Sequence, residues 1–139
     1  MRYLVSFGLF AVVHFIALMG AMWLGSDRLV ISLIPLGVVV LVVAVMRSHW
    51  LRVHGTSVAA LARHAGVALI ACWLASMLGA LLYEAMRIGG LDGWALIGRS
   101  ISDGSLLLVL CIPSLILGTI LGTSFATIRR RGADAWKTS

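Results

Sequence analysis

Four long apolar stretches restrict the fold of this chain more than any other feature of its sequence. Each holds at least 18 residues with few charges, which is enough for an α-helix to cross the roughly 30 Å hydrocarbon core of a bilayer. In lipid, an open-ended segment satisfies its backbone hydrogen bonds only as a helix. The composition agrees: 61% of the residues are hydrophobic and only 12% are charged, against about 25% charged in soluble domains. We therefore predict an all-α membrane protein with transmembrane helices over about 3–24, 29–46, 65–83 and 105–128.

Positive charge is unevenly distributed over the segments between these helices. Four crossings place the N-terminus, residues 47–64 and the tail from Arg129 on one side of the membrane, and eight of the eleven Lys and Arg residues lie there. Such an excess marks the cytoplasmic side. We predict an up-down-up-down four-helix bundle with both termini in the cytoplasm, as a multi-pass protein of a bacterial inner membrane. Anionic lipid head groups then account for the net charge of +6, and no nucleic-acid partner is needed.

The connecting segments predict where helices and domains end. Ser57 suits an N-cap, so the third helix is expected to begin before its membrane part, and Ser102 or Asp103 is expected to cap the fourth helix. Residues 1–128 are predicted to form a single transmembrane domain. The short basic cytoplasmic tail, residues 129–139, is polar and is expected to have little order.

Small residues recur on one face of three of the four helices. Gly118 and Gly122 form a GxxxG pair, and such small residues let helices approach closely in lipid, where apolar surface alone drives no association. Hydroxyls such as those of Thr119, Thr123 and Thr127 could line a water path, but they more often bond to carbonyls of their own helix. The predicted helix-packing and partner interface consists of Gly118, Thr119, Gly122, Thr123, Ala126, Ala17, Ala21, Cys72, Ser76 and Gly79.

His14 is the most distinctive polar residue of the apolar stretches. It lies about 16 Å along the first helix from Tyr3, near the middle of the bilayer. An ionisable residue at that depth suggests a proton relay, a ligand contact or a haem ligand. The alternative is a neutral histidine hydrogen-bonded across a helix interface. We favour this alternative because no Asp, Glu, Lys or Arg lies at a similar depth on another helix.

The cysteines and the other histidines give little indication of chemistry. Counted along the predicted helices, Cys72 and Cys111 differ in depth by about 11 Å, which exceeds the ~7 Å that a disulfide allows. Both are therefore predicted to be packing residues. His49 and His54 have no carboxylate or cysteine nearby, which argues against a metal site. We predict no metal, no cofactor and no catalytic residue.

Charged residues cluster at the predicted membrane boundaries. Glu84 and Arg87 are three residues apart at the outer end of the third helix and form a candidate polar site, although a local ion pair is the simpler interpretation. On the cytoplasmic side, contact with anionic lipid head groups is predicted for Arg47, Trp50, Arg52, Arg129, Arg130 and Arg131.

Three classes of function are compatible with these features. We favour protein–protein interaction, as an accessory or scaffold subunit or an immunity-type protein of a larger membrane complex, because small-residue faces are abundant and no catalytic constellation is visible. The alternative is a small homo-oligomeric transporter or channel with His14 near the midplane of its path. A membrane enzyme or cofactor subunit needs partner residues that this sequence does not offer. The expected partners are membrane lipids and either another membrane protein or further copies of this chain.

Overall fold

Almost the whole chain is helical. A computed structural model describes the backbone of residues 1–24, 29–88 and 93–137. Its helices are α1 (Arg2–Leu24), α2 (Leu29–Val53), α3 (Val58–Ile88) and α4 (Gly93–Lys137). Each contains a segment long and apolar enough to cross a membrane, and the described residues include no strand. The predicted all-helical fold with four such helices is confirmed. Side chains are described except those of residues 22–24, 29–33, 87–88, 110, 130 and 132–137.

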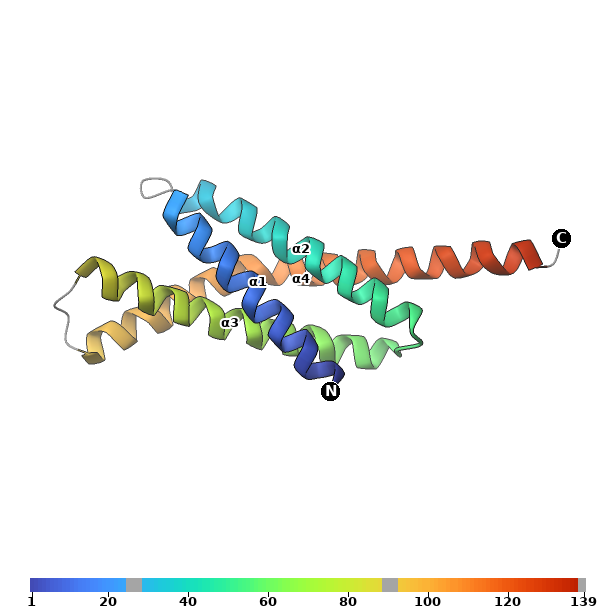
Figure 1. The fold of residues 1–139 in the computed structure, drawn as a ribbon, viewed down its shortest axis with the longest axis horizontal. Helices are drawn as coiled ribbons and strands as arrows, with labels where there is room; N and C mark the ends of the chain where they lie inside the picture. The colour runs from blue at the N-terminus through green and yellow to red at the C-terminus, as the bar shows by residue number, and fades with distance from the viewer. Residues whose placement is uncertain (25–28, 89–92, 138–139) are drawn as a thin grey trace.

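The helices α1 and α4 lie on opposite sides of the pair formed by α2 and α3 (Figure 1). Each of them packs along both α2 and α3, whereas α2 and α3 barely touch each other. Side chains of α1 and α4 therefore fill the space between α2 and α3. This arrangement determines which polar residues can meet, because those of α1 and α4 lie against the two central helices.

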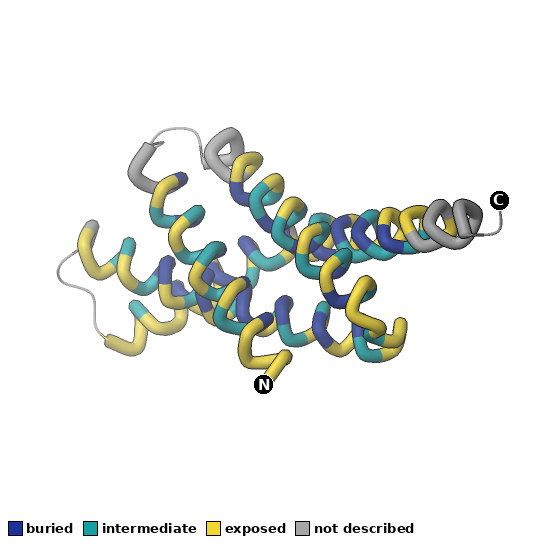
Figure 2. The backbone as a smooth tube through the Cα atoms, turned by 45° about the vertical axis from the view of Figure 1, so that its right-hand side comes forward, coloured by how far each residue is buried: buried dark blue, intermediate teal, exposed yellow. Residues whose placement is uncertain are grey.

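The interior is mainly apolar, and so is the outer surface. Buried side chains from all four helices, such as Leu18, Leu36, Cys72 and Leu115, form one cluster. The outward faces of the helices carry large apolar side chains that stay exposed (Figure 2). Hydrocarbon tails solvate such a surface as well as a protein core does, whereas water would not. The exterior therefore suits lipid.

The connection between α2 and α3 is much shorter than the predicted 47–64 segment. Since α2 continues to Val53, only residues 54–57 separate the two helices. Gly55 has a φ of 81°, a conformation that glycine adopts without steric cost. The Ala60 N–H donates to Ser57 Oγ over 3.3 Å, which confirms the predicted N-cap of α3.

The helix α4 is much longer than predicted. Its 45 residues span about 67 Å, more than twice the ~30 Å hydrocarbon core. It begins at Gly93, so the predicted cap at Ser102 or Asp103 is wrong; both residues lie exposed inside the helix. At its other end, α4 runs past α2 and α3 as the red helix of Figure 1. Residues 129–137, which the sequence predicted as a polar tail, continue the helix α4, because an existing helix propagates at little cost until a breaker stops it.

Candidate functional site

One end of the bundle gathers positive charge. It comprises residues 1–6, 47–64 and 119–131, and we call it the basic end. The Tyr3 ring stacks on His64, with 4.2 Å between the ring centroids. A hydrogen bond between Arg47 and Arg2 joins α2 to the start of α1. Residues far apart in the sequence therefore meet at this end.

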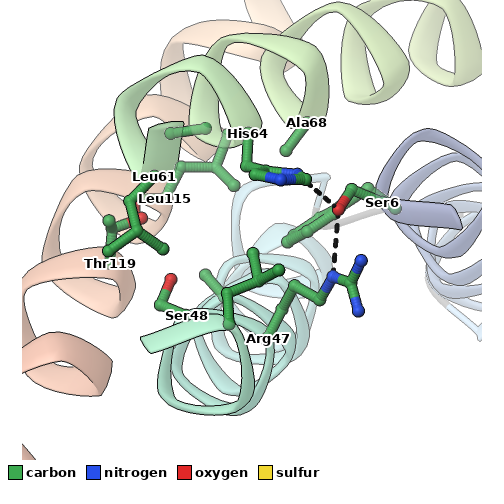
Figure 3. A pocket seen from close by; sticks show the side chains of 12 residues that line it. Ser6, Arg47, Ser48, Leu61, His64, Ala68, Leu115 and Thr119 are labelled. Atoms are coloured by element: carbon green, nitrogen blue, oxygen red, sulfur yellow. Dashed lines mark hydrogen bonds between the residues drawn. The ribbon is translucent and has the colours of Figure 1, made fainter. Parts of the chain in front are cut away.

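Three polar side chains from three helices meet at the basic end (Figure 3). Ser6 of α1 is fully buried, and its Oγ lies 2.9 Å from Nδ1 of His64 on α3. Arg47 of α2 donates from Nε to the same Ser6 oxygen over 2.9 Å. Because a hydroxyl has one proton and two lone pairs, Ser6 can serve both neighbours at once. One serine thus connects α1 to both central helices.

Besides the bond to Ser6, two further contacts fix the orientation of the Arg47 guanidinium. Nη2 donates to the main-chain oxygen of Arg2 over 3.1 Å. The Trp50 ring, one turn along α2, lies under the guanidinium with Cζ 4.9 Å from the ring centroid, within the range of a cation–π contact. An arginine stays charged under all ordinary conditions. The basic end therefore holds a fixed positive charge in a defined direction.

A small pocket lies beside this cluster, in the space between α2 and α3 (Figure 3). Ser6 and His64 form one side of it, and Leu115 and Thr119 of α4 form the other. It has room for about one water molecule. Organic ligands need several hundred cubic ångströms, so binding chemistry at this end must use the rim rather than the interior.

A second polar contact lies deeper in the bundle. His14 is 1% exposed, and its Nε2 lies 2.7 Å from Oγ of Ser76 on α3. Its Nδ1 lies 3.8 Å from the Sγ of Cys111 on α4. Ser76 and Cys111 are fully buried. Both ring nitrogens of His14 therefore face partners within the chain, an arrangement that links α1 to α3 and α4.

The expected difference in depth between the two cysteines is wrong. A Cβ built on Gly104 would lie 2.9 Å from the Met77 Cα, so these two residues are level on α4 and α3. Counted from that contact, Cys111 lies about 10 Å and Cys72 about 7 Å along the bundle axis. Both thiols belong to the same core cluster. The estimate failed because it started α4 near residue 105, whereas the α3–α4 pairing begins further out.

The GxxxG pair of α4 packs against α2 of the same chain. A Cβ built on Gly118 would lie 2.6 Å from the Ala44 Cβ, and one built on Gly122 would lie 2.5 Å from the Val45 carbonyl oxygen. Real Cβ atoms essentially never approach other atoms so closely, so only glycine permits this contact between α4 and α2. The predicted glycine face is thus covered within the chain.

Most of the other predicted interface positions also face the interior. Gly79 approaches Leu18 of α1, and Ala17 packs against the core. Buried positions of the set also include Ala21, Cys72, Ser76 and Ala126. The hydroxyls of Thr119, Thr123 and Thr127 donate to carbonyls of α4 itself, over 2.7, 2.8 and 2.9 Å.

The polar site predicted around Glu84 contains a contact that the sequence did not indicate. Glu84 Oε2 lies 4.0 Å from Nη1 of Arg99 on α4, a distance that allows attraction but not a hydrogen bond. The predicted Glu84–Arg87 pair involves a side chain outside the described residues. Arg99 could not be identified in advance because α4 was expected to begin after it.

The predicted head-group residues lie at the basic end. Trp50 is 43% exposed, and Arg129 and Arg131 are exposed on α4, while the side chain of Arg130 falls outside the description. Arg52 donates to the Thr56 carbonyl over 3.1 Å. Among the described residues, no three His, Cys, Asp or Glu side chains are placed to hold a metal ion.

Sequence reasoning identified Arg47 and His14 as candidate site residues. It assigned no role to Ser6 or to His64, which form the cluster at the basic end together with Arg47. A usable signal existed, since Ser6 and His14 are the clearly polar residues of the first apolar stretch. Comparison of the chain with protein-family models, curated proteins and solved structures finds no match.

Proposed function

We propose that this chain is a multi-pass protein of a bacterial inner membrane that acts by protein–protein interaction, as an accessory or scaffold subunit or an immunity-type protein of a larger complex. The observation that carries the proposal is the length of α4. Crossing a bilayer needs about 20 residues, and α4 has 45. A helix that runs so far past its own bundle offers surface to something else.

The hydrogen-bond partners of the buried polar groups support the same proposal. His14 bonds with Ser76, and Ser6 bonds with His64 and Arg47. These contacts hold the helices together and leave His14 facing its own chain. A transport path at the axis of a homo-oligomer needs side chains on the subunit surface, and His14 is 1% exposed. The geometry therefore favours interaction over transport.

The membrane orientation is part of the proposal. The arginines of the basic end support its placement in the cytoplasm by the positive-inside rule. Both termini then lie in the cytoplasm, and the C-terminal extension of α4 projects into it. A reporter fused after Ser139 that is active only in the periplasm contradicts this orientation.

The test of the interaction is the native mass of the protein extracted in mild detergent. We expect a complex with a stoichiometric larger partner, and we expect that partner to be lost when residues 129–139 are deleted. Arg63→Gln, which removes one exposed charge from α3 at the same end, serves as the control and keeps the partner. Recovery of the chain as a monomer or as a pure homo-oligomer contradicts the proposal.

A further inference from the structure

The basic end carries positive charge without a described carboxylate to balance it. The side chains of two acids are described, Glu84 and Asp103. Glu84 pairs with Arg99 at the opposite end of α3 and α4, and Asp103 is adjacent to Gly104, which packs on Met77. Within the described residues, the charges of Arg2 and Arg47 therefore face no protein anion.

Arg47 is held in place yet keeps donors to spare. A guanidinium has five N–H groups, and Arg47 uses two of them, one to Ser6 and one to the Arg2 carbonyl. Figure 3 shows Nε turned toward Ser6 and the two terminal nitrogens turned away from the pocket. The remaining donors thus point outward from a fixed base, which lowers the entropy lost when a ligand binds.

The site also lies at a suitable depth. Arg47 directly follows the apolar stretch that ends at Met46, and Trp50 is a residue type that gathers at the membrane interface. Planar guanidinium groups match the oxygen spacing of phosphate and bind it through two parallel hydrogen bonds.

We propose that Arg47, oriented by Ser6 and Trp50, forms a binding site for one anionic phosphate group at the basic end. Arg2, whose main-chain oxygen accepts from Arg47, supplies the second positive charge. A phospholipid head group and a free phosphate ion share this chemistry. The site is independent of the proposed partner complex, since the bundle alone forms it.

The test uses the full chain, stripped of lipid in a neutral detergent. Phosphatidylglycerol is added in one arm and inorganic phosphate at matched ionic strength in the other, and the melting temperature and the native mass are recorded. Saturable binding of one lipid per chain, with a raised melting temperature, is expected for a lipid site. A response to inorganic phosphate as well indicates a site for the free ion. A protein that responds to neither, or that binds lipid without saturation, overturns the proposal.

Two variants connect the response to these residues. Arg47→Lys keeps the charge but loses the planar fork, and we expect affinity to fall about tenfold, the effect of one charge-assisted hydrogen bond. Arg2→Gln removes a charge while keeping the main-chain carbonyl, and it carries the test if Arg47→Lys does not fold. Arg63→Lys on the exposed face of α3 is the control with unchanged affinity. Wild-type affinity in both Arg47→Lys and Arg2→Gln contradicts the proposal.

Discussion

Two serine–histidine contacts join α1 to α3, and their surroundings differ. At the basic end the serine belongs to α1 and the histidine to α3, as Ser6 and His64. Deeper in the bundle the order is reversed, as His14 and Ser76. The deep contact is enclosed by the buried thiol of Cys111. The end contact is extended by the Arg47 guanidinium, which carries a charge to the surface.

The difference shows that the same polar pair can serve two purposes. In a dry interior, a polar group without a partner costs free energy, so the His14 contact works as an attachment between helices. At the basic end, the pocket beside Ser6 and His64 has room for about one water molecule that can replace a lost bond, so the Ser6 contact matters less for stability. The main effect of the Ser6 contact is to orient the Arg47 guanidinium.

The largest effect is expected where α4 closes against α2 beside the basic end. A Cβ on Gly122 would lie 2.5 Å from the Val45 carbonyl oxygen and 3.0 Å from the main-chain nitrogen of His49. Backbone atoms cannot rotate away, so Gly122→Val should cost about 3 kcal/mol of unfolding free energy, measured by titration with a denaturing detergent. Gly66→Val, at an exposed position with nothing within 4 Å of its Cβ, should cost far less. Equal costs would show that α4 does not pack there.

A smaller effect is expected at the deep contact. His14→Ala leaves the buried Ser76 hydroxyl without its partner, which should cost about 2 kcal/mol. A double-mutant cycle with Ser76→Ala should give a coupling energy between about 0.6 kcal/mol, the average for hydrogen bonds between membrane helices, and about 1.7 kcal/mol, the largest value for such bonds. The control is His54→Ala, which changes an exposed residue. A coupling energy of zero would show that the bond between His14 and Ser76 does not hold α1 to α3.

The Ser6 contact should be weaker than the deep one. Ser6→Ala is expected to cost about 1 kcal/mol, because a water molecule in the adjacent pocket can bond with His64 while Arg47 keeps its bond to the Arg2 carbonyl. The same detergent titration measures it, with the exposed Ser102→Ala as control. A cost larger than that of His14→Ala would reverse the assignment of roles.

The smallest expected change is in the reactivity of a buried thiol. Cys111 is fully buried next to His14, so a maleimide should label it slowly in a Cys72→Ala background. We expect His14→Ala to speed labelling about threefold, which corresponds to a local opening that is easier by about 0.6 kcal/mol. Ser6→Ala should leave the rate unchanged, because Ser6 lies two turns away along α1. Acceleration by both variants would mean that the two contacts open as one unit.

The sequence alone identified four helices able to cross a membrane. Long apolar stretches in lipid have few alternatives to a helix, and the described structure agrees. It also located Ser57 as the start of α3, because an N-cap depends on residues within one turn. The same local reasoning failed at Ser102 and Asp103. A residue that suits an N-cap does not force the helix to begin there, and α4 begins earlier, at Gly93.

Which residues meet was decided only by the tertiary structure. The sequence marked His14 as an isolated polar residue, but the register of α1 against α3 brings Ser76 to it. It marked Gly118 and Gly122 as a contact to a neighbouring helix of this chain or another, and the structure places α2 of the same chain there. Hydropathy and periodicity act within one helix. The pairing of helices depends instead on their full lengths and on how closely their backbones approach, and that approach is settled only when all four pack together.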